Sequence, residues 1–435
     1  MTPNIKQRIE QIRNGGVPEG YKQTRVGIIP EDWKVMRLKD KFDRLSRKNA
    51  EGNTNVLTIS AQYGLINQEE FFKKEIASDD KSNYYLLHHG EFAYNKSYSN
   101  GYPFGAIKRL SRYDKGVVSP LYICFSANSN NACPEYFEQY FEAGKLNHEI
   151  QAFAQEGARN HGLLNISVSD FFYSFILVPP VAEQEKIAKI LSMQDKVIEC
   201  YEKKIEQLRL MKKYYLQNMF PKRGETIPKI RFKGFADAWV QRKLSEIGER
   251  VTRKNQDLVS ELPLTISAQY GLIDQNEFFD KRIASKDVSG YYLVKNGEFA
   301  YNKSTSVDAP WGAVKRLDKY EMGVLSTLYI VFSIIDKGKT DSDFLVTYYD
   351  TNLWHNGVQA VAAEGARNHG LLNISADDFL ETSLLLPQDI EEQKLIGSFF
   401  RNLDHLITLH QRLCEEEKKK KKALQQLLLT GIVRL

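Results

Sequence analysis

The chain has 435 residues, of which 42% are hydrophobic and 26% are charged, and its formal net charge is +5. This composition is typical of a globular protein with two or three domains, and the mildly basic charge permits a polyanionic partner. No apolar run approaches the roughly 20 residues of a membrane span, and the polar N-terminus does not resemble a signal peptide. Four cysteines without a CxxC pair predict neither a zinc site nor a disulfide framework, which favours a reducing cytoplasm.

The first domain is expected at residues 24–180 (domain 1), after an N-terminal helical segment at residues 1–23. Short aromatic and β-branched segments predict its strands, and a polar insert leads into a predicted helix. The strands are expected at residues 91–94, 121–125 and 172–178, and the helix at residues 134–143. We therefore predict an α+β domain with a curved, mostly antiparallel sheet.

A long amphipathic helix is predicted at residues 181–221. Its apolar residues recur three or four positions apart, with a repeat close to seven that is typical of a coiled-coil seam. About 36 helical residues at about 1.5 Å each would span about 55 Å. Such a helix cannot bury its apolar stripe alone and needs a partner.

The second half of the chain repeats the first, with domain 2 expected at residues 222–387 and a second long helix at residues 388–435. The repeated segments include LTISAQYGLINQEEFF (57–72, again at 264–279 with two differences), GEFAYNKS (90–97 and 297–304) and EGARNHGLLNIS (156–167 and 364–375). Because the offset stays at 207 or 208 residues, a whole domain has been duplicated. The predicted fold class is α+β: two homologous mixed or antiparallel-sheet domains separated by two long antiparallel coiled-coil helices, with pseudo-two-fold symmetry.

Several motifs occur twice in the same order. They are a tryptophan near the start of each domain (Trp33, Trp239), a Glu-Gln pair that opens each long helix (Glu183 and Gln184, Glu392 and Gln393), and an Asp-Phe turn after each EGARNHGLLNIS segment (Asp170 and Phe171, Asp378 and Phe379). The sequence RFKGF at residues 231–235 precedes the second tryptophan. In this combination, over essentially the whole chain, the sequence resembles the specificity subunit of type I restriction–modification systems.

The resemblance implies two target-recognition domains that each read half of a split site in double-stranded DNA. It also implies that the helices act as a spacer and dock two methyltransferase subunits, with restriction and translocase subunits as optional partners. Catalysis would belong to those partners, so we expect a non-catalytic chain without a cofactor. The sequence agrees, because it has no Walker A sequence, no G-x-G-x-x-G opening a strand–helix unit and no Asn-Pro-Pro-Tyr-like motif.

Base reading needs forked or amide side chains, and phosphate binding needs cations. After the shared GEFAYNKS segment, the two domains diverge into the sequences YSNGYPF (98–104) and TSVDAPW (305–311), which we call the tips. Divergent tips on a shared framework are what base-reading loops would look like, although solvent-exposed turns are also free to differ. The candidates here are Asn95, Lys96, Ser97, Tyr98, Asn100 and Tyr102, and in domain 2 Asn302, Lys303, Ser304, Thr305, Asp308 and Trp311.

Three further groups are candidates for DNA contact. Cations at strand ends suit phosphates, although such residues are often only solvated; these are Lys108, Arg109, Lys315 and Arg316. Arginine suits guanine and asparagine suits adenine, but asparagine also caps turns; these are Arg159, Asn160, His161, Arg367, Asn368 and His369. A glycine turn in each domain carries residues that would read or stack on bases, or pack in the core; these are Gln62, Tyr63, Gln269 and Tyr270. The histidines lack further ligands at metal spacing, so no metal site is predicted.

The likeness of the two domains predicts the form of the target. If antiparallel helices relate the domains by a pseudo-two-fold axis, each domain meets the duplex facing the opposite way, and a symmetric protein matches symmetric DNA. We therefore predict a gapped and at least partly palindromic site, with a gap of fixed length. The alternative functions are a two-domain scaffold that binds proteins, and an enzyme acting alone, for which clustered carboxylates are lacking.

Overall fold

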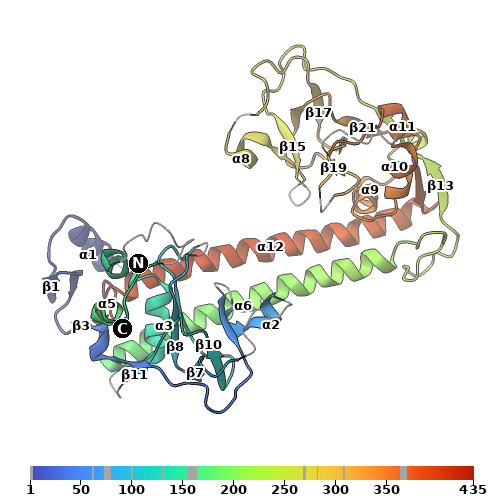
Figure 1. The fold of residues 1–435 in the computed structure, drawn as a ribbon. Helices are drawn as coiled ribbons and strands as arrows, with labels where there is room; N and C mark the ends of the chain where they lie inside the picture. Colours follow the sequence, from blue (N-terminus) through green and yellow to red (C-terminus); the bar gives the residue numbers. More distant parts are fainter. Residues whose placement is uncertain are drawn as a thin grey trace. The chain divides into compact units, whose positions relative to one another are not determined.

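A computed structural model gives the fold of the chain (Figure 1). It describes residues 3–60, 63–72, 80–98, 101–128, 132–153, 164–267, 271–281, 283–306, 309–362 and 370–435. The chain divides into two compact units: unit 1 is residues 1–201 with 413–435, and unit 2 is residues 202–412. Each unit therefore contains one sheet domain together with one end of each long helix.

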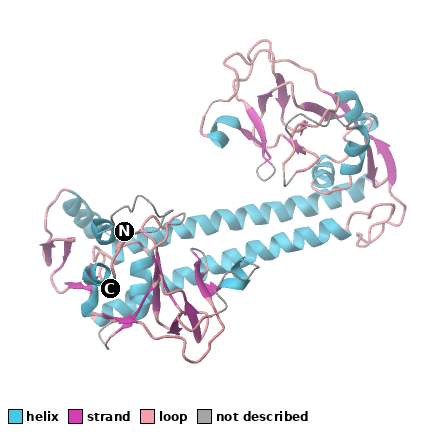
Figure 2. Ribbon diagram, viewed as in Figure 1, coloured by secondary structure: helices cyan, strands magenta, loops and turns pink. Residues whose placement is uncertain are grey.

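Unit 1 contains a four-stranded antiparallel sheet with the order β4-β11-β8-β9 and four separate pairs of strands. Figure 2 shows the strands in magenta. Its core is strongly aromatic, and Phe42, Phe92, Phe125 and Phe137 are almost completely buried. The elements are α1 (Pro3–Arg13), β1 (Tyr21–Thr24), β2 (Gly27–Pro30), β3 (Lys34–Arg37), η1 (Leu38–Asp40), β4 (Phe42–Leu45), β5 (Leu57–Ser60), β6 (Gly64–Asn67), α2 (Gln68–Phe72), β7 (Tyr85–His88), β8 (Phe92–Asn95), β9 (Ala106–Arg109), β10 (Lys115–Val118), β11 (Ile123–Ala127), α3 (Pro134–Glu142), α4 (Asn147–Phe153), α5 (Val168–Tyr173), β12 (Phe175–Val178) and α6 (Val181–Asn218).

Unit 2 repeats this plan with a four-stranded antiparallel sheet of order β14-β21-β18-β19. Its core is again aromatic, with Trp239, Phe299, Phe332 and Phe344 buried. The elements are β13 (Val240–Lys243), α7 (Leu244–Ile247), β14 (Gly248–Arg250), β15 (Leu264–Ser267), β16 (Gly271–Asp274), α8 (Gln275–Phe279), β17 (Tyr292–Lys295), β18 (Phe299–Asn302), β19 (Ala313–Arg316), β20 (Met322–Leu325), β21 (Ile330–Ile334), α9 (Ser342–Tyr349), α10 (His355–Val361), α11 (Ala376–Leu380), β22 (Ser383–Leu386) and α12 (Ile390–Leu428).

The predicted fold class is confirmed: two similar sheet domains accompany two long helices that pack together. The predicted helix at residues 134–143 is α3, which begins at Pro134. Three predicted details were wrong. The expected strand at residues 121–125 begins only at Ile123, as β11. The expected strand at residues 172–178 is shorter, because Phe172 lies in α5 and β12 begins at Phe175. The expected Asp-Phe turns are helical, since Ser167 and Ser375 cap the short helices α5 and α11 by accepting a hydrogen bond from a backbone N–H.

The two long helices contact each other in both units. In unit 1, the start of α6 and the end of α12 share an apolar core that contains Ile187, Leu191 and Leu428. In unit 2, the end of α6 and the start of α12 share a second core that contains Leu208 and Ile396. In each unit the start of one helix meets the end of the other, so the pairing is antiparallel. With 38 and 39 residues, each helix extends for roughly 57 Å at about 1.5 Å per residue.

The Glu-Gln pair that opens each long helix joins that helix to its surroundings. In unit 1, the Glu183 carboxylate accepts hydrogen bonds from Trp33 Nε1 at 2.9 Å and from Arg434 Nε at 2.7 Å. The Gln184 side chain accepts a hydrogen bond from the backbone N–H of Cys133 at 2.9 Å, just before α3. The motif therefore holds the helix start to the domain and to the residues that follow the other long helix.

The second Glu-Gln pair does the same in unit 2. The buried Glu392 carboxylate pairs with Arg231, which follows α6, through hydrogen bonds of 2.6 and 2.8 Å. Gln393 accepts a hydrogen bond from Asp341 N at 2.9 Å, just before α9. An arginine that follows one long helix thus binds the glutamate that opens the other. Within the described residues, no helix is apolar over a length sufficient to cross a membrane.

Candidate nucleic-acid interface

The Asn-Lys-Ser motif of domain 1 lies directly after β8. The Asn95 side-chain oxygen accepts a hydrogen bond from Ser97 N at 3.0 Å, and Lys96 Nζ donates to the carbonyl of Ile166 at 3.4 Å. The Lys96 carbonyl accepts a further hydrogen bond from Leu164 N at 3.1 Å. The motif therefore attaches the start of the tip to the chain that follows the EGARNHG sequence.

Domain 2 repeats these contacts after β18. Asn302 accepts a hydrogen bond from Ser304 N at 3.0 Å, and Lys303 Nζ donates to the Ile374 carbonyl at 3.3 Å. Leu372 N donates to the Lys303 carbonyl at 3.0 Å. In both domains the structure thus brings together two segments that the sequence had singled out separately. The Asn and Lys side chains of the motif hold this junction.

The end of each tip is fixed by a buried tyrosine. Tyr94 Oη donates to the Phe104 carbonyl, and Tyr301 Oη donates to the Trp311 carbonyl, at 2.8 Å in both domains. The next residue in domain 1, Gly105, has a φ of +76°, and a Cβ atom there would lie 2.3 Å from a backbone carbonyl oxygen. Glycine suits this backbone conformation and this close approach. Each tip is therefore anchored at both ends while its sequence differs.

Removing the Tyr301 hydroxyl tests this anchor. We expect Tyr301→Phe to lower the free energy of unfolding by about 1 kcal/mol, because the Trp311 carbonyl loses its donor. Urea unfolding followed by tryptophan fluorescence would measure the change. Tyr214→Phe is the control, because the side chain of Tyr214 is 52% exposed on α6. Equal stability of the two variants would contradict the anchoring role.

Two candidate tyrosines of domain 1 are open to solvent. Tyr98 is 62% exposed and Tyr63 is 55% exposed. An exposed aromatic ring is suited to stacking on a base. In domain 2, Thr305 stands at the position of Tyr98 and is only half-buried, and its N and Oγ1 both donate to the Gly370 carbonyl, at 2.6 and 3.0 Å. The two tips therefore present different chemistry at the same position.

The candidate cations of domain 1 are ion-paired to α3. Lys108 Nζ lies 2.5 Å from a Glu142 oxygen, and Arg109 lies 2.6 Å from Glu135. The two basic side chains are only 11% and 12% exposed. Tyr102 also donates to Glu142, at 2.5 Å, and burial together with this carboxylate raises the pKa of the Tyr102 phenol. These side chains stabilise the domain, and their role as DNA ligands stays a prediction.

The cations of domain 2 are held in the same way. Lys315 lies 2.8 Å from Asp350, and Arg316 lies 2.8 Å from Asp343. Asp350 also pairs with Lys212 of α6 at 2.9 Å. Phosphate contact by Lys315 or Arg316 also stays a prediction, and it would require these carboxylates to move.

Eleven candidates lie outside the described residues: Gln62, Asn100, Arg159, Asn160, His161, Gln269, Tyr270, Asp308, Arg367, Asn368 and His369. Among the residues that the structure does describe, no cluster of three or more metal-ligating side chains occurs. Sequence reasoning missed Lys222 and Arg223, which line a pocket of domain 2. The adjacent basic pair directly after the long helix was the signal that could have found them.

Comparison with known proteins gives the relationships of the chain. No protein-family model matches it. A specificity subunit of the type I restriction enzyme MjaX from Methanocaldococcus jannaschii is 24% identical over 440 residues, covering 96% of this chain and 97% of that protein. By sequence, the chain is similar to this specificity subunit over nearly its whole length. The predicted resemblance is confirmed.

One solved structure supports the fold. The specificity subunit of a type I restriction–modification system from M. genitalium has a TM-score of 0.54 at 11% identity, covering 91% of this chain and 96% of that chain. A chain from a structural study of complex assembly in a type I restriction–modification system has a TM-score of 0.49 at 14% identity, covering 93% and 99%. The first of these likenesses supports the arrangement of two sheet domains and two long helices.

Proposed function

We propose that the chain is the DNA-specificity subunit of a type I restriction–modification complex, and that each sheet domain reads one half of a gapped DNA site. The observation that carries this proposal is a framework that the two domains share, with tips that differ between them. In both domains a tyrosine at the equivalent position anchors the end of the tip. A lysine at the equivalent position binds the start of the tip to the segment after EGARNHG. Between the shared GEFAYNKS segment and the GAIKRL or GAVKRL segment that follows, the residues that differ most are those between these anchors.

We expect the site to be nearly palindromic, because the two domains share their framework and most of their candidate DNA ligands. Differences between the tips, such as Tyr98 against Thr305, would account for asymmetry between the half-sites. Because the candidate ligands include cations, binding should weaken steeply as salt increases.

We propose that the long helices fix the distance between the two half-sites and that they dock two methyltransferase subunits. Restriction and translocase subunits would bind to that complex as optional partners. Each unit leaves apolar helix residues open to solvent. In unit 1, Met193 is 58% exposed and Val197 42%; in unit 2, Leu210 is 57% exposed and Tyr214 52%. Exposed apolar side chains on a helix that already has a partner are suited to a further protein contact. The chain itself is a non-catalytic subunit, and the adenine methylation belongs to its partners.

Modified-base sequencing of genomic DNA from the host, with and without this gene, tests the function. We expect deletion to abolish N6-methyladenine at one gapped motif, and re-expression of the chain to restore it. A motif with related halves would support two equivalent readers. An unchanged methylome beside an intact methyltransferase gene would contradict the proposal and favour a protein scaffold.

A further inference from the structure

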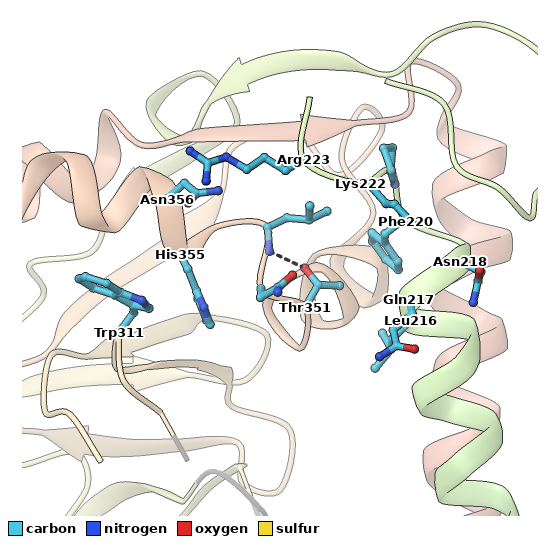
Figure 3. Close-up of a pocket in the computed structure, with 13 residues that line it drawn as sticks. Leu216, Gln217, Asn218, Phe220, Lys222, Arg223, Trp311, Thr351, His355 and Asn356 are labelled. Carbon is cyan, nitrogen blue, oxygen red and sulfur yellow. Dashed lines mark hydrogen bonds between the residues drawn. The ribbon is translucent and has the colours of Figure 1, made fainter. Parts of the chain in front are cut away.

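A pocket of about 650 Å³ in domain 2 has a lining suited to an anion (Figure 3). Thirteen residues line it, and none is an aspartate or a glutamate. Lys222 and Arg223 enter from the segment after α6, and both side chains are exposed. Neither forms an ion pair with any described residue, in contrast to Lys315 and Arg316 of the same domain. The local charge is therefore positive and not neutralised by the fold.

The remaining lining supplies neutral donors and aromatic surface. Gln217 and Asn356 bring side-chain amides, whereas the Asn218 amide already donates to the Tyr214 carbonyl at 2.7 Å. Trp311 forms one wall beside His355 (Figure 3). Burial lowers the pKa of His355, which favours the neutral form of its ring. Cations and amides together are the side chains that bind phosphate oxygens in protein–DNA interfaces.

The position of the pocket connects it to base reading. Trp311 is the last residue of the domain 2 tip, and its carbonyl accepts the hydrogen bond from the anchoring tyrosine. A duplex that reaches this tip would bring its backbone close to the wall formed by Trp311. The size of the pocket falls within the range of about 300–1,000 Å³ that is typical of ligand sites.

In unit 1, the segment that follows the long helix α12 is covered by other residues of the same unit. Gly431 stands 39 residues after Glu392, as Lys222 stands 39 residues after Glu183. The Gly431 carbonyl accepts a hydrogen bond from Tyr21 Oη at 2.7 Å, and a Cβ atom at Gly431 would meet Pro30 at 2.5 Å. The N-terminal segment therefore covers the end of α12, whereas the lysine and arginine after α6 remain exposed.

We propose that this pocket binds a phosphate group of the DNA backbone through Arg223 and Lys222, beside the half-site that domain 2 reads. This inference rests on the proposed function. It makes the two readers unequal: domain 2 gains a phosphate contact that adds affinity without adding sequence information.

The first experiment tests the anion site itself, with inorganic pyrophosphate and the full-length chain. Of the four tryptophans, Trp33, Trp239 and Trp354 are almost fully buried, so a change in fluorescence on titration should come from Trp311. Loss of the signal in Trp311→Phe would assign it. We expect Lys222→Ala/Arg223→Ala to weaken binding at least tenfold. Lys229→Ala/Lys233→Ala removes the same charge from exposed positions outside the pocket and should bind as the wild type does. No saturable signal in the wild type would overturn the proposal.

The second experiment identifies the source of the phosphate, with the target duplex and with dAMP. For wild type and both double variants, duplex affinity is measured between 50 and 200 mM salt. Each lost phosphate contact reduces the magnitude of the slope of log K against log salt by about 0.9. The slope of the pocket variant should therefore be shallower by about 1–2, and the slope of the control variant should not change. The pocket variant could instead keep the salt slope of the wild type and yet lose the binding of dAMP. This outcome would assign the site to a free nucleotide and overturn only the assignment to DNA. Absence of duplex binding in the wild type and all variants would instead count against the proposed function.

Discussion

Replacing Asp350 with alanine is expected to lower the free energy of unfolding of unit 2 by about 3 kcal/mol. Asp350 lies between Lys315 of β19, at 2.8 Å, and Lys212 of α6, at 2.9 Å. Lys212 also reaches Asp404 of α12 at 2.8 Å. Breaking a buried ion pair from one side costs about 3–5 kcal/mol, and the lower value applies here because these side chains are about one-fifth exposed.

The same variant has a pH signature. Burial alone would raise the pKa of Asp350, but the two lysines outweigh it and hold the pKa below its ordinary value. A carboxyl whose folded pKa is depressed stabilises the fold above its unfolded pKa of about 3.9, and this contribution is lost as the pH falls through the folded value. The difference between wild type and variant should therefore be complete at pH 7 and shrink below about pH 4.

Urea unfolding followed by tryptophan fluorescence is the suitable measurement, because Trp239, Trp311 and Trp354 lie in unit 2 and only Trp33 lies in unit 1. Glu381→Ala is the matched control. It removes a carboxylate from a pair with Lys243 in which both side chains are more than half exposed, and such solvent-screened pairs contribute little to stability. If both variants lost the same stability, the buried network would have no special role.

The ion pairs show how the two domains differ beneath their shared framework. In domain 1, Glu142 holds Lys108 and the Tyr102 hydroxyl. In domain 2 the tip has Ala309 where domain 1 has Tyr102, and Asp350 binds Lys212 of the long helix in its place. The tip sequence and the partner of the buried carboxylate therefore changed together.

The architecture could be predicted from the sequence, because a duplication and a helical periodicity can each be recognised within continuous segments of the chain. The offset of 207 or 208 residues predicted two like domains, and the apolar stripes predicted α6 and α12. The roles of individual cations were not predictable in this way. From the sequence alone, Lys108 is expected to be a solvated cation at the end of a strand. Its partner Glu142 lies 34 residues further along the chain, so the ion pair cannot be recognised without the fold. The Glu-Gln motif was recognised, but its contacts to Arg434 and Arg231 depend on the folded arrangement.

Giving domain 2 the tip of domain 1 is expected to change the DNA motif. The exchange Thr305→Tyr, Val307→Asn and Asp308→Gly converts TSVD into YSNG, the sequence of residues 98–101. It leaves Ala309, Trp311 and the tyrosine anchor unchanged, so the loop keeps its attachment at both ends. If the tips read bases, the half-site of domain 2 should acquire the preference of domain 1, and the motif should become more symmetric.

A single bidentate base contact discriminates by about 1–3 kcal/mol, or about 5- to 150-fold, so the change should be visible as a new methylated motif rather than as a weaker old one. Modified-base sequencing of a deletion strain that expresses the variant would measure it. Lys319→Arg/Glu321→Asp is the control, because it also brings domain 1 residues into domain 2 but in the turn between β19 and β20. The control should leave the motif unchanged. An unchanged motif in the tip variant as well would assign base reading to other segments, and the EGARNHG sequences, whose ends the Asn-Lys-Ser motifs hold, would be the next to test.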